Sequence, residues 1–192
     1  MVGATLVGIV FDNGVVLAAD RRVTLGSYVH GQAKKVHLLD GGLVIGFAGL
    51  VADAQSLLRV MREEIRYYTM EAKRPMSVEA AAKLLSNILY SYKMYPLTTE
   101  AMLGGIQGQA KLVVLDPLGS TIYDNYAAAG TGGAIAIGVL ESGYREGMGE
   151  EEAVRLAVEA VRTASRRDAL TGDRVDVAVA RREGSYEKTF SL

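Results

Sequence analysis

The chain has 192 residues, of which 49% are hydrophobic and 22% charged, with a formal net charge of −1 and no cysteine. A chain of this length can bury a substantial core as one domain, and its near-neutral charge predicts neither a nucleic-acid nor a membrane-surface partner. The lack of cysteine excludes disulfides and thiolate chemistry, and two histidines leave little for a zinc site or a histidine-based triad. No stretch reaches the roughly 18 apolar residues of a membrane span, so we expect a soluble, cytoplasmic protein.

Two apolar runs at the start of the chain flank Asn13-Gly14. This dipeptide predicts a β-hairpin with a type I′ turn, because that turn needs positive φ at both central residues. The first strand would begin at Ala4, and the second would end on the charged cluster Asp20-Arg21-Arg22. A chain end held inside a sheet is unusual, because termini fray unless they are tied down. We therefore expect the function of the protein to depend on Ala4 and its neighbour Thr5.

The rest of the first half predicts an irregular segment, a second hairpin and two helices. Residues 23–33 are polar and aromatic, whereas the apolar runs 35–39 and 43–48 flank Asp40-Gly41-Gly42. Apolar residues then recur at helical spacing over residues 50–68 and 78–92, and Ser77 is placed to cap the second helix.

The second half repeats this alternation of strands and helix pairs. We expect strands over residues 101–108, 111–116 and 120–129, a helix over 132–144, a helix from 150 that Gly172 closes, and strands over 175–180 and 185–191. This order predicts an α+β fold. Several strands are apolar on both faces and need helices outside both sheets, which indicates a four-layer αββα sandwich.

Four short signals could carry chemistry, and each also has an ordinary structural interpretation. Gly130-Thr131-Gly132-Gly133 could hold an anion at a helix start, but alone it is typical of a tight strand-to-helix turn. Lys34-Lys35 is typical of a solvated pair, and Arg167-Asp168 of a surface ion pair. Gly49 could offer its N–H to an oxyanion or only allow close packing. Taken singly, these signals do not identify a function.

The order and spacing of these motifs resemble the β-type subunits of the 20S proteasome, from about residue 4 to the C-terminus. The matching stretches are residues 8–22, Lys35, residues 48–55, 130–132, 138–144 and 167–172. The pattern looks archaeal, and residues 32–37 and 124–128 are similar to a subtype found where an organism has two β subunits. The resemblance implies an N-terminal-nucleophile hydrolase fold that works in stacked rings without a cofactor or metal.

The same resemblance implies the partners of the chain. They would be proteasome α subunits, other β subunits including a catalytic sister, and an ATP-dependent regulatory particle at the α ring that feeds in unfolded protein substrates. The complex would be a threonine-type endopeptidase that degrades proteins in the cytoplasm. Residues 1–3 would form a short segment before a single domain over residues 4–192.

In this family the first residue of the mature chain is a threonine, released when a propeptide is removed after a glycine. Its hydroxyl attacks the peptide carbonyl, and its α-amine serves as the base. The resemblance places the Lys35 ammonium beside this residue, the Asp20 carboxylate on the lysine, and Gly49 as the oxyanion donor. Phe47 would lie near the specificity pocket and predicts that this pocket is narrow.

Around the amine, the resemblance places Thr131, Asp168 and Thr171, where two serines are usual in place of the threonines. The nucleophile position itself holds Ala4, which has no hydroxyl for attack or for self-cleavage. Thr5 comes one residue late, and a one-residue shift along a strand turns a side chain to the opposite face. Thr5 would therefore point away from the lysine.

Three explanations stay open for Ala4. The chain is a naturally non-catalytic β subunit that serves ring assembly and shapes the chamber, or an engineered Thr→Ala variant of an active subunit, or an endopeptidase that uses Thr5 after removal of residues 1–4. The extra methyl groups of Thr131 and Thr171 favour the first. A small-molecule amidohydrolase of the same fold is a further alternative, but it would have a cysteine, serine or threonine at its mature terminus and insertions over a pocket.

Overall fold

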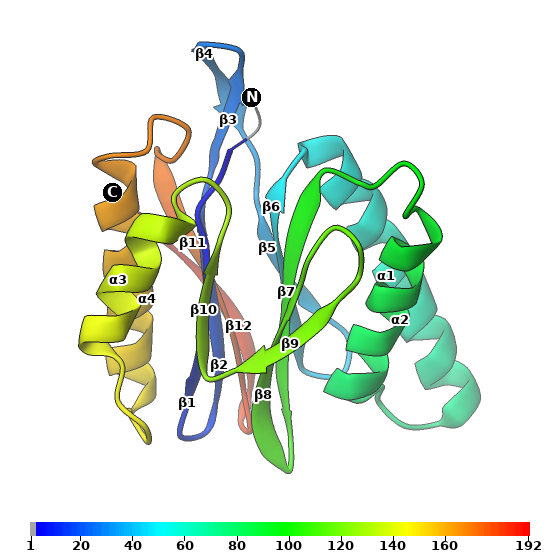
Figure 1. Ribbon diagram of the computed structural model, residues 1–192. Coiled ribbons are helices and arrows are strands. Elements are labelled where there is room, and N and C mark those ends of the chain that lie inside the picture. The colour runs from blue at the N-terminus through cyan, green and yellow to red at the C-terminus, as the bar shows by residue number, and fades with distance from the viewer. Residues whose placement is uncertain (1–2) are drawn as a thin grey trace.

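The computed structural model describes residues 3–192 and consists of two β-sheets packed face to face, with two helices on the outer face of each (Figure 1). The first sheet has the order β10-β1-β2-β11-β12, and the second has the order β5-β6-β7-β8-β9. The first sheet contains β1 (Leu6–Phe11), β2 (Gly14–Asp20), β10 (Tyr126–Ala129), β11 (Arg174–Arg181) and β12 (Gly184–Ser191). The second contains β5 (Val36–Leu39), β6 (Leu43–Gly49), β7 (Thr99–Gln107), β8 (Gln109–Leu115) and β9 (Thr121–Asp124).

Helices close the sandwich on both sides, which confirms the predicted αββα fold. Helices α1 (Val51–Ala72) and α2 (Val78–Ser91) cover the second sheet, and α3 (Gly133–Gly143) and α4 (Glu150–Ser165) cover the first (Figure 1). Helices α1, α2 and α4 bury apolar stripes seen in their sequences, as α1 does with Leu57, Leu58, Met61 and Ile65. Helix α3 buries Ala136 and Leu140, whereas its isoleucines are only partly buried. No helix within residues 3–192 is long and apolar enough to cross a membrane.

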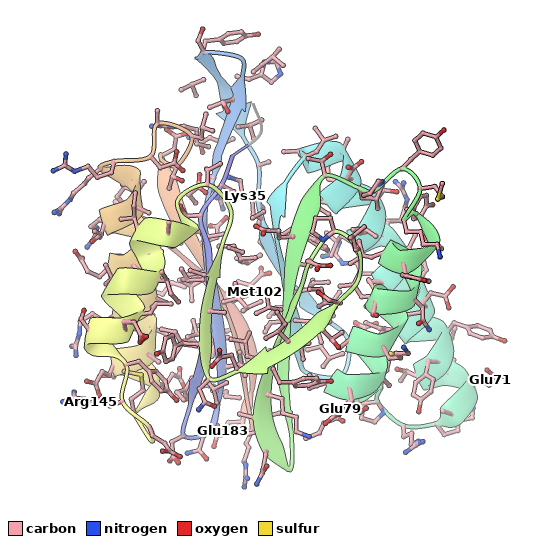
Figure 2. All side chains as sticks on the ribbon, in the orientation of Figure 1. Lys35, Glu71, Glu79, Met102, Arg145 and Glu183 are labelled. Atoms are coloured by element: carbon pink, nitrogen blue, oxygen red, sulfur yellow. The ribbon has the colours of Figure 1, made fainter. Side chains whose placement is uncertain are left out.

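The space between the sheets forms a third layer of core, because the inner faces of both sheets are apolar. Leu6 and Leu17 from the first sheet pack there with Met102 and Leu112 from the second. Met102 lies between the two sheets in Figure 2. Strands that are buried on both faces explain why their sequences show continuous apolar runs rather than alternation.

The first hairpin forms, but its turn differs from the predicted one. Phe11 pairs with Gly14, which places Asp12 and Asn13 at the centre of the turn, and neither of them nor Gly14 has a positive φ. Gly14 is needed for packing instead, because a Cβ there would lie 2.1 Å from the carbonyl oxygen of Ala180. The type I′ prediction was wrong because the register pairs Gly14 with Phe11, so Gly14 lies in the strand and not at the centre of the turn.

Most of the segment 23–33, predicted to be irregular, belongs to a two-stranded hairpin of β3 (Arg22–Leu25) and β4 (Tyr28–Gln32). This hairpin projects beyond the sandwich at the end where β1 begins (Figure 1). Its apolar side chains Leu25, Tyr28 and Val29 are exposed. Because the hairpin has no buried face, its sequence lacks the alternating pattern that indicates a strand.

Residues 120–129 form two strands in different sheets rather than the one predicted strand. The β9 strand pairs with β8, and the β10 strand pairs with β1, so the chain changes sheets at Asn125. The Asn125 carbonyl accepts the N–H of Val10 at 2.7 Å and holds this crossing in place. Neither glycine nor proline marks the change of direction in the sequence.

Candidate active site

Residues 3–5 enter the sandwich at the end that carries the β3–β4 hairpin, and all three are buried. The carbonyl oxygen of Ala4 accepts the N–H of Gly132 at 3.3 Å, and the carbonyl of Thr5 accepts the N–H of Asp20 at 3.3 Å. Gly130 has a φ of 83°, and a Cβ at this position would lie only 2.2 Å from the carbonyl oxygen of Ala4. The predicted glycine-rich turn before α3 therefore packs directly against the backbone of residue 4.

Ala4 and Thr5 place their side chains in different environments. Ala4 packs among the residues between the sheets, and it lines an open cavity together with Gly49. The Thr5 hydroxyl lies 2.7 Å from the hydroxyl of Thr171, and a Cβ on Gly132 would lie 2.0 Å from it, so it faces the α3–α4 layer. This arrangement follows from the alternation of side chains along an extended chain.

A buried charged pair, Asp20 and Lys35, lies next to these residues. Lys35 Nζ donates to Asp20 Oδ1 at 3.0 Å and to the Arg22 carbonyl at 2.8 Å. Asp20 is fully buried and accepts three more hydrogen bonds, from the N–H groups of Thr5 (2.9 Å), Arg22 (2.9 Å) and Gly172 (3.1 Å). Gly172 therefore serves this carboxylate rather than closing α4, which ends at Ser165.

Lys34 and Lys35 have opposite surroundings, although they are adjacent. Lys34 pairs with Glu187 at the surface, whereas the side chain of Lys35 is only 7% exposed. Burial lowers the pKa of the Lys35 ammonium below its ordinary value, and the Asp20 carboxylate opposes this shift by favouring the charged form. A lysine in such a setting can exchange a proton with a neighbouring group more readily than one in water. The interpretation as a solvated pair holds for Lys34 alone.

The second group of predicted site residues forms a hydroxyl cluster, which consists of Thr5, Thr131, Asp168 and Thr171. Asp168 Oδ2 accepts the hydroxyls of Thr131 at 2.6 Å and Thr171 at 2.7 Å, and Oδ1 accepts the N–H of Leu170 at 3.1 Å. The Thr131 hydroxyl also lies 3.4 Å from the carbonyl oxygen of Ala4. Asp168 is thus held by hydroxyls and an amide, and the interpretation as a surface ion pair with Arg167 was wrong.

Gly49 separates two cavities at this end of the sandwich. Its φ is 143°, and a Cβ would lie 2.2 Å from the carbonyl oxygen of Thr98, so the backbone here requires glycine. One cavity, of about 360 Å³, is lined by Gly3, Ala4, Ala48, Gly49, Thr98, Thr99, Glu100, Pro117, Gly130 and Thr131. The other, of about 290 Å³, is lined by residues 32–35, His37, Phe47, Gly49, Val51, Ala54, Gln55 and Leu58.

His37 lies on the wall of the second cavity, two strand positions beyond Lys35 on the same chain segment. The pKa of His37 is lowered to about 4, mainly by burial and also by the positive charges of Lys34 and Arg62, whereas Glu187 opposes this shift. The imidazole is therefore neutral near pH 7. Phe47 lines the same cavity.

The structure brings all eight predicted site positions to one end of the sandwich, around the backbone of residue 4. Lys35 marks this end in Figure 2, whereas Glu183 lies at the opposite end. Sequence reasoning missed Glu100, which lines the first cavity and accepts the N–H of Gly130 at 2.7 Å. Glu100 belongs to none of the sequence motifs. Only the pairing of β7 with β6 brings it beside residue 4, so no local pattern could have indicated it.

An αββα sandwich with a buried lysine–carboxylate pair beside the start of its first strand defines the class of N-terminal-nucleophile hydrolases. A model of the family described as "Proteasome subunit" matches residues 1–180. The chain is 49% identical to "Proteasome subunit beta 1" of Hyperthermus butylicus, covering 94% of this chain and 90% of that protein. It is 43% identical to "Proteasome subunit beta 2" of Pyrobaculum aerophilum, covering 97% and 93%. The chain belongs to the proteasome subunit family and is of the β type.

Proposed function

We propose that this chain is a non-catalytic β subunit that helps to build and line the proteolytic chamber of an archaeal 20S proteasome. The observation that carries the proposal is that residue 4, which the resemblance places at the nucleophile position, is an alanine beside the buried Asp20 and Lys35 pair. In this proposal Asp20 and Lys35 correspond to the pair that activates a terminal threonine, and Gly49 to the oxyanion donor. Thr131, Asp168 and Thr171 correspond to the groups around its amine.

The proposal includes the partners and the setting of the particle. Cleavage is assigned to a sister β subunit in the same rings, α subunits cover the β rings, and an ATP-dependent regulatory particle delivers unfolded proteins in the cytoplasm. Residues 4–192 act as a single domain, and residues 1–3 are retained as a short segment before it. Family membership supports this assignment, and the lack of a hydroxyl at Ala4 supports retention, because self-cleavage needs that hydroxyl.

The buried position of Thr5 supports the non-catalytic interpretation over an active Thr5. The side chain of Thr5 is fully buried, its hydroxyl bonds Thr171, and its N–H bonds Asp20. To take the place of residue 4, Thr5 would have to shift by one residue along the strand. That shift would break the pairing of Leu6 with Ala19 and turn every side chain of β1 to the opposite face.

The test is to supply the missing hydroxyl. Particles are assembled from α subunits, a sister β subunit whose own nucleophile has been replaced by alanine, and this chain with Ala4, Ala4→Thr or Ala4→Val. Valine is the matched control, because it has the shape of threonine without the hydroxyl. We expect peptide hydrolysis only with Ala4→Thr, together with a chain that begins at residue 4 by mass analysis.

Three results would overturn the proposal. Hydrolysis by the unsubstituted chain that disappears in Thr5→Ala, with a mass that begins at residue 5, would make Thr5 the nucleophile. A chain that never joins α rings would remove the role in the particle. Assembled Ala4→Thr particles without any hydrolysis would show that the residues around residue 4 do not correspond to a catalytic site.

A further inference from the structure

The cavity beside Ala4 contains one charged side chain, that of Glu100. The other lining residues are glycine, alanine, threonine and proline, so no lysine, arginine or histidine borders this space. Glu100 is half-buried on β7, and its Oε2 accepts the N–H of Gly130 at 2.7 Å. This bond fixes the carboxylate against the glycine-rich turn that packs on residue 4.

The charge of Glu100 has no counter-ion among residues 3–192, where every ion pair involves other acidic groups. Two further carboxylates bond to residues of the cavity wall: Asp53 accepts the N–H of Thr98 at 2.8 Å, and Asp168 accepts the hydroxyl of Thr131 at 2.6 Å. The nearby Lys35 forms its ion pair with Asp20. The bond from the N–H of Gly130 offsets part of the hydration that this half-buried carboxylate loses, and a cation that enters the cavity would offset more of it.

We propose that Glu100 makes this cavity a binding site for a basic side chain, lysine or arginine, of an unfolded polypeptide in the chamber. The cavity is about 360 Å³ and open to solvent, which suits an aliphatic stem that ends in a charged group. Because the cavity and the Phe47 cavity meet at Gly49, an extended peptide that crosses Gly49 places neighbouring side chains in the two spaces. This inference rests on the proposed function for its ligand, since it takes the chamber's substrates to be polypeptides.

Glu100 would then act as a specificity-determining residue even in a subunit that does not cleave. A non-catalytic subunit that holds basic residues would retain such segments near a catalytic sister subunit. This role is one of binding and not of catalysis, because Glu100 would contact a side chain of the substrate and not its scissile bond.

The test measures binding and needs no catalysis. Three fluorescent hexapeptides with blocked ends and no other charge carry lysine, glutamine or glutamate at the same position. Their dissociation constants are measured with the full chain, with Glu100→Gln, which keeps an oxygen for the N–H of Gly130, and with Glu183→Gln. Glu183 is an exposed acid at the opposite end of the molecule and gives the matched change in net charge (Figure 2).

We expect the lysine peptide to bind about tenfold more tightly than the glutamate peptide, and this preference to weaken as salt is added. The preference should disappear in Glu100→Gln and persist in Glu183→Gln. A preference that survives Glu100→Gln, no preference in the unsubstituted chain, or no binding of any peptide would overturn the inference. Failure of the proposed function appears separately, in the hydrolysis assay on Ala4→Thr particles, so the two failures are distinguishable.

Discussion

The charged pair and the hydroxyl cluster lie on two sides of residue 4, and they differ in how deeply they are built into the fold. Asp20 is fully buried and accepts four hydrogen bonds, one of them from the Lys35 ammonium. In the hydroxyl cluster, Thr5 and Thr171 are fully buried, but Asp168 is half-buried and Thr131 is exposed. A buried charge that loses its partner destabilises a protein strongly, whereas a hydroxyl at the surface can exchange its partner for water.

This difference shows why a lysine–carboxylate pair by itself is weak support for catalysis. The charged pair joins the end of β2 to the start of β5 and holds the backbone of Thr5 and Gly172. It therefore has a structural reason to remain in a chain with alanine at residue 4. The hydroxyl cluster contributes less to the structure. Variants that change the charged pair and the hydroxyl cluster one at a time therefore test this comparison.

The largest effect is expected when the charged pair is broken. Lys35→Met leaves the Asp20 carboxylate buried without its counter-ion and should lower the free energy of unfolding by about 3–5 kcal/mol. Lys34→Met is the matched control, because its surface pair with Glu187 is worth about 0–1 kcal/mol. Urea unfolding followed by circular dichroism measures both. Equal losses in the two variants would contradict the structural role of the charged pair.

A smaller effect is expected from the buried part of the hydroxyl cluster. Thr171→Val keeps the shape of the side chain but removes its bonds to Thr5 and Asp168, which should lower the free energy of unfolding by about 1–2 kcal/mol. Thr171→Ser keeps the hydroxyl and should recover most of the loss. If valine and serine behave alike, the hydroxyl contributes nothing to stability.

The pH dependence of stability should report on the neighbourhood of the charged pair. Because burial lowers the pKa of His37 to about 4 from an unfolded value near 6.5, the folded chain binds this proton less readily than the unfolded chain. The contribution of neutral His37 to the free energy of unfolding is therefore complete above pH 6.5 and is lost as the pH falls towards 4. Allowing for partial exposure, we expect a loss of about 1 kcal/mol. Unfolding is measured at pH 7 and pH 4, and the loss between them should be smaller by about this amount in His37→Gln than in the unsubstituted chain.

The smallest effect is expected at the exposed edge of the hydroxyl cluster. Thr131→Val removes the bonds from the Thr131 hydroxyl to Asp168 and the Ala4 carbonyl, but water can replace them. We expect a change of about 0.5 kcal/mol or less in the free energy of unfolding. A loss comparable to that of Thr171→Val would show that the hydroxyl cluster is as much a part of the core as the charged pair is.

Sequence patterns predicted those elements whose signal is local. Helical spacing in residues 50–68 and 78–92 predicted α1 and α2, and Ser77 caps α2 by accepting the N–H of Ala80 at 3.1 Å. The hairpin around residues 40–42 and the strands of the second sheet also follow from their apolar runs. The errors lie where strand pairing decides: Gly14 pairs with Phe11 and Arg181 as part of β2 instead of lying in the turn, and pairing divides residues 120–129 between two sheets.

By itself, the sequence determined most of the order of helices and strands, the layered α+β class and the presence of alanine, without a hydroxyl, at residue 4. These properties follow from residue identity and from apolar spacing, which any part of the chain carries with it. Only the tertiary structure decided that Lys35 is buried while Lys34 is exposed, that Asp168 binds hydroxyls, and that Glu100 lines the cavity beside residue 4. The physical reason is that burial, pKa and cavity walls depend on residues far apart in the chain that only the packing of the two sheets brings together.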